Sequence, residues 1–434
     1  MDLTNYLSTL KGATPLHLAS LILISAMERA PREMWAEIFM QSIYCPSGLV
    51  EIRSDSLPLR LRQVCRYWKQ TALDSTPTLW TSMTVSSSNM HSQGLRAIKA
   101  WLERSGSLGL TITIGPVKAS QHMVGDVMAI ILSHSERLIY LSLPAELSAS
   151  ALCANVQLPQ LQALALYMPT PMHLRLPSSA IHLRDVTLML GSPFLGAGGQ
   201  IRAAVLNPLD VRLAWEQLTR LTLRCFTGSI DTFHNVLLCC PRLIFISLDD
   251  FSLAPSRWQR RLRHLTLKSI HLLTENDPTS FLDSLILPSL DTIHIDVMSP
   301  VAAEFSLRLR LQIVLLSWLT GFRTLILRGL FITERDLMWL ALISPSIRNM
   351  VIMYDGNDLV TERVTGMLTK TLNLSYFRNV SLGTSFSSHL GVPPLKSSFA
   401  QVQVIVVEIR MPTKPHTSHA GLHRSNEKQK IIEE

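Results

Sequence analysis

Residues 218–248 read LTRLTLRCFTGSIDTFHNVLLCCPRLIFISL and contain two copies of one short pattern, LxxLxL, separated by a polar and apolar mixture. After Ser229, apolar residues recur three and four positions apart, which is typical of one face of a helix. Each LxxLxL copy is typical of a short strand that buries alternate residues. The stretch therefore predicts a strand, a helix and a second strand. The copies are Leu218-Leu221-Leu223 and Leu243-Ile246-Leu248, and the helical stripe is Ile230, Phe233, Val236 and Leu237.

The same pattern recurs along most of the chain, with starts about 19 to 35 residues apart, close to the spacing of leucine-rich repeats. No such strand is stable alone, so neighbours must stack into a solenoid. The sequence predicts an α/β fold: an irregular leucine-rich-repeat solenoid over residues 81–411, with a parallel sheet on its concave face and helices on its convex face. The other copies begin at Leu138, Leu161, Leu183, Leu262, Leu290, Phe322 and Ile347, with a weaker one at Phe377.

Further segments fit this plan. Residues 307–322 predict a long apolar helix, and Thr333 opens another with an approximate capping box. Residues 402–409, VQVIVVEI, predict a last strand. The Gly-rich insertion at residues 192–200 lacks the GK[ST] of a phosphate-binding loop.

Residues 30–80 differ from the repeats, because they predict two amphipathic helices, about residues 31–43 and 58–72. In the first, Met34 and Ile38 share one face, with Trp35 and Phe39 beside them. The second carries an apolar stripe. Its members are Leu57, Leu61, Val64, Cys65, Trp68 and Ala72.

This region resembles the F-box of large fungal protein families, on the motifs PREMWAEIF at residues 31–39, QVCRYW at 63–68 and TLW at 78–80. Residues 101–114 and 134–137 also resemble segments that follow the F-box in those families. Ala30 stands where Leu is usual, and Arg62 where a small residue is common.

The resemblance implies a module that docks on the Skp adaptor of an SCF-type cullin–RING ubiquitin ligase. The protein would then be a non-catalytic substrate receptor that captures targets on its repeats. The residues that would hold the adaptor are Pro31, Met34, Trp35, Ile38, Phe39, Leu61, Val64, Cys65 and Trp68.

Composition, charge and the terminal segments limit the class of protein. With 47% hydrophobic and 17% charged residues over 434 positions, most of the chain is expected to fold. The net charge of +8 is compatible with an acidic partner but too dilute to indicate nucleic acid. The apolar run at residues 16–27 is too short to span a bilayer, and its apparent signal-peptide cleavage site is poor. Residues 1–29 are therefore expected to form a separate N-terminal segment, with a helix packed beside residues 30–80 as the favoured interpretation. Residues 412–434 are expected to be a disordered tail.

Six cysteines occur without a CxxC pair or the Cys/His spacing of a zinc site. Buried, reduced thiols in a cytoplasmic or nuclear protein are the favoured interpretation. No motif of a hydrolase, metalloprotease, nucleotide-binding or calcium-binding site is present, so no cofactor, metal or enzymatic activity is predicted. Asp249 and Asp250 are adjacent carboxylates, which favour a turn after a strand over a metal site.

Side chains between the buried repeat positions are expected on the concave face. Among them, Arg220, Arg224, His264 and Lys268 are candidates for a basic strip that binds an acidic or phosphorylated target, with Arg328 further along. Other members of the face are Tyr140, Ser142, Tyr167, Asp185, Thr222, Phe245, Asp249, His294 and Asp296. An ordinary solvated face is the alternative.

Two other functions remain open at this point. In one, the protein is a repeat scaffold outside any ligase, and residues 30–80 only cap the open end of the solenoid. In the other, it is an enzyme whose site the motifs do not reveal.

Overall fold

The computed structural model describes the protein from Ala30 to Ile409, with gaps. The described residues are 30–43, 52, 56–115, 121–144, 156–168, 174–175, 179–190, 211–254, 261–275, 278–298, 307–328, 330, 340, 346–347, 349–355, 377–384 and 402–409. The predictions for residues 1–29, the insertion at 192–200, the helix at Thr333 and the tail at 412–434 lie outside these residues. None of the described helices has both the length and the apolar character needed to cross a membrane.

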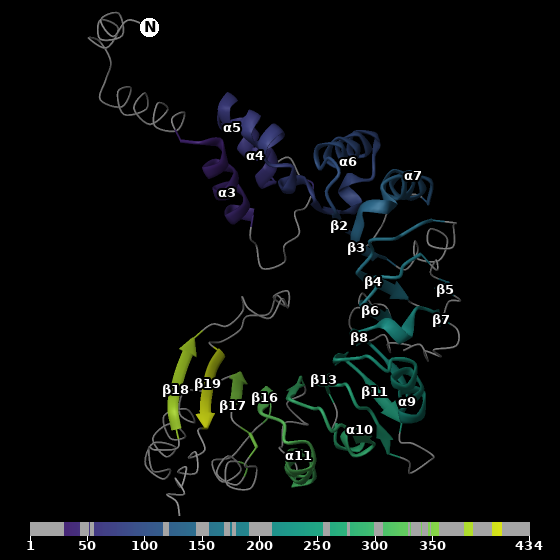
Figure 1. The fold of residues 1–434 in the computed structure, drawn as a ribbon, viewed down its shortest axis with the longest axis vertical. Coiled ribbons are helices and arrows are strands. Elements are labelled where there is room, and N and C mark those ends of the chain that lie inside the picture. The colour runs from purple at the N-terminus through teal and green to yellow at the C-terminus, as the bar shows by residue number, and fades with distance from the viewer. Residues whose placement is uncertain are drawn as a thin grey trace, which may run out of the picture.

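The fold is α/β, dominated by one 13-stranded sheet that curves into an open arc (Figure 1). From β1 to β17 every neighbouring pair is parallel. The strands in order across the sheet are β1 (Ser82–Val85), β2 (Leu110–Ile114), β3 (Leu138–Leu143), β4 (Ala163–Met168), β6 (Asp185–Leu190), β8 (Arg220–Arg224), β10 (Phe245–Asp249), β13 (Ser269–Thr274), β15 (Thr292–Val297), β16 (Thr324–Arg328), β17 (Asn349–Asp355), β19 (Val402–Ile409) and β18 (Phe377–Thr384).

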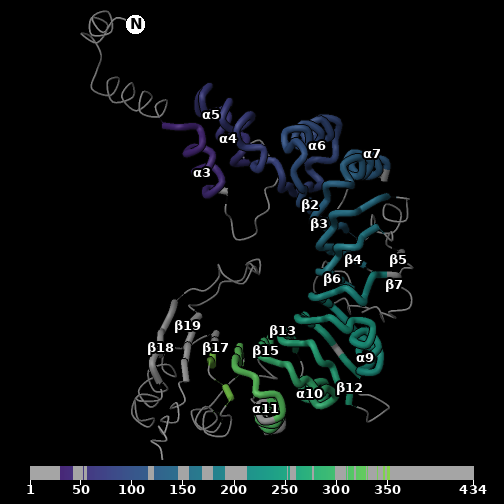
Figure 2. The backbone as a smooth tube through the Cα atoms, in the orientation of Figure 1, coloured from purple at the N-terminus to yellow at the C-terminus, as the bar shows by residue number. Residues whose placement is uncertain are grey.

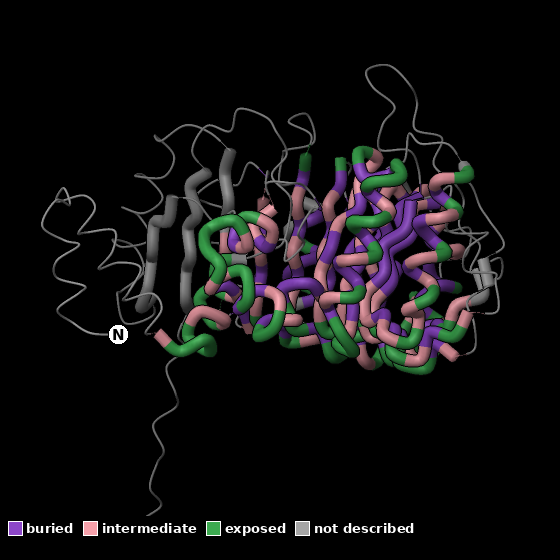
Figure 3. The backbone as a smooth tube through the Cα atoms, turned by 90° about the horizontal axis from the view of Figure 1, so that it is seen from above, coloured by how far each residue is buried: buried purple, intermediate pink, exposed green. Residues whose placement is uncertain are grey.

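A ladder of apolar side chains runs through the sheet, one from each repeat and each paired with the next in register. Every member is at most 2% exposed. Because these residues come from the middle LxxLxL position, the sequence pattern itself sets the register. The ladder is Leu141, Leu164, Val186, Leu221, Ile246, Ile270, Ile293, Leu325 and Met350. Figure 3 shows the buried positions running through the strands.

Helices cover the outer side of the arc (Figure 2). Their buried side chains belong to the same core as the ladder. They are α6 (Ser92–Arg104), α7 (Gln121–Leu132), α9 (Ile230–Cys239), α10 (Thr279–Asp283) and α11 (Leu307–Thr320). The predicted helices after Ser229 and at residue 307 are thus confirmed. Ser229 caps α9, since its Oγ accepts a hydrogen bond from Thr232 N at 3.1 Å. Short parallel pairs add to this outer region: β5 (Leu174–Arg175) with β7 (Val211–Arg212), β9 (Thr227–Ser229) with β11 (Ser252–Ala254), and β12 (Leu262–Arg263) with β14 (Leu285–Ile286).

The chain before the sheet forms a small helical module of α3 (Arg32–Ile43), α4 (Leu57–Val64) and α5 (Arg66–Gln70). The first predicted helix is confirmed, but the second is wrong as one continuous helix. Cys65 is extended, with φ −158° and ψ 171°, and ends α4; its Sγ then accepts from Trp68 N at 3.4 Å to start α5. A π-helical turn at Thr71–Ser75 and a 3₁₀ turn at Pro77–Trp80 complete the module.

The break at Cys65 places Trp68 against Trp35 and Phe39, with ring centroids 4.9 and 5.0 Å apart. This aromatic cluster is the centre of the module, and Phe39 is 1% exposed. Trp80 then joins the module to the sheet region, since its ring packs edge-on against Trp101 of α6 at 4.8 Å. The module and the first repeats therefore share one core.

Two features of the sheet correct the prediction. The repeat predicted at Leu262-Leu265-Leu267 is displaced by five residues: Leu265 is 59% exposed, and the buried positions are Leu267 before the strand and Ile270 and Leu272 within it. The last two strands also depart from the parallel pattern, because β19 pairs antiparallel with both β17 and β18.

Leu265 and Leu267 offer a matched test of this register. Leu267→Ala should lower the free energy of unfolding by about 2–5 kcal/mol, because it leaves a cavity in the core. Leu265→Ala should change it by no more than about 0.5 kcal/mol, because that side chain is mostly in solvent. Urea titration measures both. A larger loss for Leu265→Ala would restore the register predicted from sequence.

Candidate functional site

The inner side of the arc, here called the concave face, carries three rows of side chains that run across the strands. They occupy the positions that alternate with the buried ladder. In the middle row, Thr222, Ser247, His271 and His294 are successive neighbours on β8, β10, β13 and β15. The sheet therefore brings together residues that lie 23 to 25 positions apart in sequence.

The row beside it holds the charges, in the order Arg224, Asp249, Leu273, Asp296, Arg328 across the strands from β8 to β16. Arg224 Nε lies 3.0 Å from Asp249 Oδ2, and Arg328 Nη1 lies 3.6 Å from Asp296 Oδ2. Each arginine thus has a carboxylate neighbour. The two carboxylates lie on β10 and β15, on either side of β13.

The third row contains another ion pair, Arg220 with Asp185, whose Nε and Oδ2 are 3.7 Å apart. The Arg220 guanidinium also lies 4.4 Å from the ring centroid of Phe245. Burial raises the pKa of the Asp185 carboxyl, and Arg220 opposes this shift. Asp250 follows β10 in a left-handed turn with φ 54°, and its N donates to Leu273 O at 2.7 Å.

The basic strip predicted from Arg220, Arg224, His264 and Lys268 is wrong as a continuous strip. His264 is 5% exposed, away from the concave face, with its Nε2 3.0 Å from Cys240 O. Lys268 precedes β13, where its carbonyl accepts from Asp291 N and Thr292 N. The misplaced register at residue 265 caused both errors. Of the predicted target-binding residues, Arg220, Arg224 and Arg328 do lie on the concave face, and all three are ion-paired.

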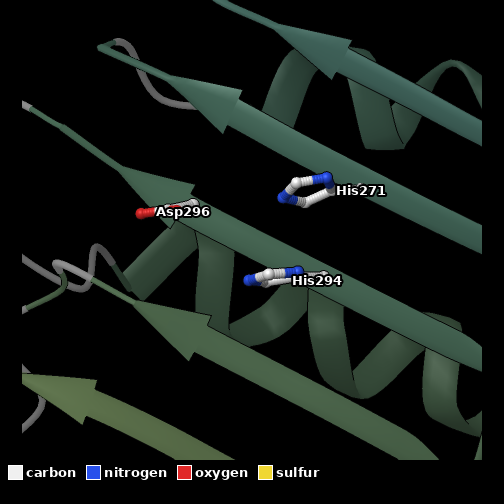
Figure 4. A group of neighbouring side chains, drawn as sticks. All are labelled: His271, His294 and Asp296. Atoms are coloured by element: carbon white, nitrogen blue, oxygen red, sulfur yellow. The ribbon is translucent and has the colours of Figure 1, made fainter. Parts of the chain in front are cut away.

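His271, His294 and Asp296 form a close group at the middle of this face (Figure 4). The imidazoles are stacked, with centroids 4.1 Å apart and planes 18° apart. One donor atom from each of the three residues lies within 4.8 Å of the others. Among the described residues, no other group of three His, Cys, Asp or Glu side chains gathers in this way. The prediction of no metal site did not foresee it.

A chain of polar contacts fixes His271. Ser247 Oγ donates to Asp249 Oδ1 at 2.6 Å, so the same Oγ accepts from His271 Nδ1 at 3.0 Å. Burial lowers the pKa of His271. Burial, with His271 and Arg328 adding to it, lowers the pKa of His294 to about 3. Both imidazoles are neutral at neutral pH, and the Nε2 atoms of both are buried without a hydrogen-bond partner.

A second candidate surface lies on the helical module. Of the predicted adaptor-binding residues, Met34, Ile38 and Val64 are 55%, 47% and 54% exposed, and Pro31 and Cys65 are also exposed. Phe39 and Leu61 are buried at 1% and 7% exposure, while Trp35 and Trp68 are half-buried. The set therefore divides into an outer surface and the core that supports it.

The described cysteines do not offer a reactive thiol in the sheet. Burial raises the pKa of Cys225 to about 11 and that of Cys240 to about 12, so both stay protonated. Cys65 was predicted on a buried stripe, and this is wrong, since it is exposed at the break between α4 and α5. Cys45 and Cys153 lie outside the described residues.

No protein-family model matches the sequence, and no curated protein matches it at a significant level.

The lowered pKa of His294 predicts acid sensitivity. The unfolded chain binds a proton on this imidazole below about pH 6.5, while the folded chain resists it, so stability is lost as pH falls from 6.5 toward 3. Between pH 7 and pH 5, the free energy of unfolding of the wild type should fall by up to about 2 kcal/mol more than that of His294→Gln.

Chemical denaturation in the presence of a chelator measures this difference. His182→Gln is the control, since His182 is an exposed residue. Equal acid sensitivity of the wild type and His294→Gln would show that His294 does not contribute.

Proposed function

We propose that the protein is a non-catalytic substrate receptor of an SCF-type ubiquitin ligase. The module of α3, α4 and α5 would dock on a Skp-type adaptor, and through it on a cullin scaffold. The curved sheet, as an irregular leucine-rich-repeat solenoid, would hold a target protein. The observation that carries the proposal is the exposed apolar surface of the module.

That surface is not needed to close the core of the module. Met34 and Ile38 lie four residues apart on one face of α3, while Trp35 and Phe39 on the adjoining face complete the aromatic cluster with Trp68. Val64, at the end of α4, is exposed as well. A contiguous group of exposed large apolar side chains, as Met34 and Ile38 form on α3, supports a protein interface at this surface. The resemblance of residues 31–39 and 63–68 to the F-box is what favours a Skp-type adaptor as the partner in this proposal.

The repeats support the second half of the proposal. From β1 to β17 the strands are parallel and line the concave face, with helical segments on the outer side, and such arrays present extended concave binding surfaces. The three rows of polar side chains on this face suit protein recognition. An acidic or phosphorylated target would have to compete with Asp185, Asp249 and Asp296 for the arginines.

Introducing negative charge on the exposed surface of the module tests whether this surface docks on the adaptor. Ile38→Glu with Val64→Glu should weaken binding to a purified Skp-type adaptor at least about 30-fold, because apolar anchors at the centre of an interface carry 2 kcal/mol or more. Titration calorimetry with the full-length chain gives the dissociation constants. Both side chains are about half exposed, so the fold should survive, which circular dichroism checks.

Leu238→Glu is the matched control. Leu238 is an exposed apolar residue on α9, 64% exposed and outside the module. It should leave adaptor binding unchanged. If the wild type fails to bind the adaptor, or if the double variant binds as well as the wild type, the module only caps the sheet and the ligase proposal fails.

A further inference from the structure

We propose that His271, His294 and Asp296 form a binding site for a divalent transition-metal ion of the zinc class on the concave face. This inference concerns the sheet alone and does not depend on adaptor docking. It rests on the position of three donor groups, on two unpaired buried nitrogens and on the support behind His271.

The donors come from adjacent, rigidly paired strands. His271 and His294 are register partners on β13 and β15, and Asp296 follows on the same face of β15. Figure 4 shows the two imidazoles side by side, with Asp296 further along the strand that carries His294. Tetrahedral ligands at zinc distances are about 3.3 Å apart. The donor atoms lie within 4.8 Å of one another, so the side chains must rotate and bring them about 1.5 Å closer to converge on one ion.

The unpaired nitrogens point to a missing partner. Nε2 of His271 and Nε2 of His294 are both buried and have no hydrogen-bond partner. A buried polar atom without a partner is costly, and the cost disappears if the nitrogens coordinate an ion. The two rings are stacked, with centroids 4.1 Å apart. One shared ligand therefore explains both unpaired nitrogens more simply than a separate explanation for each.

The support of His271 selects the form that binds metal. Ser247 Oγ donates its single O–H to Asp249 Oδ1, so it can only accept a hydrogen bond from His271 Nδ1–H. The lone pair of the neutral ring is then on Nε2. Metal-bound histidines are commonly held in this way, with the other ring nitrogen donating to a polar group that is itself fixed.

The ligand set indicates the class of metal. Two imidazole nitrogens and one carboxylate suit Zn²⁺ or a neighbouring first-row ion rather than Ca²⁺ or Mg²⁺, which prefer oxygen. Three protein ligands also leave a fourth position open. An imidazole, carboxylate or thiolate side chain of a bound protein could fill it. The positive charge of Arg328, which is paired with Asp296, weakens the binding of a cation at this site.

Titration of the full-length, chelator-treated protein with Zn²⁺ tests the site, and Co²⁺ serves as the spectroscopic probe. We expect one ion per chain at this site and visible d–d absorption from the Co²⁺ form. His271→Ala and His294→Ala together should abolish this binding. Ser247→Ala should weaken it about 10- to 100-fold, as loss of an outer partner does.

Arg328→Gln gives a test of opposite sign. Removing this cation should tighten Zn²⁺ binding about two- to fivefold, the range that a partly exposed ion pair is worth. A merely structural role of Arg328 would not strengthen binding, so an unchanged or weaker affinity would count against Asp296 as a ligand.

Histidines elsewhere in the chain require a control. His416, His419 and His423 are closely spaced in sequence and lie outside the described residues. Their triple substitution by Ala should leave the Co²⁺ spectrum of the concave face intact. The proposal is overturned if no Zn²⁺ binds, if binding survives the His271 and His294 double variant, or if the tail variant removes all of it.

Discussion

The structure depends on the burial of the three apolar LxxLxL side chains of each repeat, in register with those of its neighbours, between the sheet and its outer helices. A single strand such as β8, even with the helix α9 that follows it, has no neighbouring strand within its own repeat. Leu221 is fully buried, with Val186 and Ile246 as its register partners on either side and the buried side chains of α9 in the same core. Each such residue stabilises the fold by about 1.5–3 kcal/mol when fully buried, and the gain is shared between neighbours. The repeats are therefore stable only as a stack.

This constraint also sets what the concave face can do. Side chains alternate along a strand, so the register that pairs Ile270 with Ile293 also pairs His271 with His294. No local motif is needed to bring the two imidazoles together. The polar site is a consequence of the packing on the opposite side of the same strands, and it is as rigid as that packing.

The sequence predicted the general fold well, because LxxLxL and the helical stripes are local signals. It failed where two local solutions compete. Residues 262–267 and 267–272 both fit LxxLxL, and only even spacing separates them. Leu267 follows Leu243 by 24 residues and precedes Leu290 by 23, whereas Leu262 gives unequal intervals of 19 and 28. The even spacing could therefore have placed His271 on the concave face from the sequence. The helix break at Cys65 gave no such signal, because it goes with a tertiary contact, the packing of Trp68 against Trp35 and Phe39, that the local pattern does not contain.

The charges of the concave face are arranged around the histidine pair. Across the strands the order is arginine, aspartate, leucine, aspartate, arginine, with the carboxylates of Asp249 and Asp296 on the inner side. A cation at the centre meets the carboxylates first, while an anion is favoured only further out, toward Arg224 and Arg328. Two stacked neutral imidazoles at the centre cannot both accept a proton without repulsion. Protonation can therefore satisfy only one of the two imidazoles. A single metal ion would use the lone pairs of both rings at once and fits the charge pattern better.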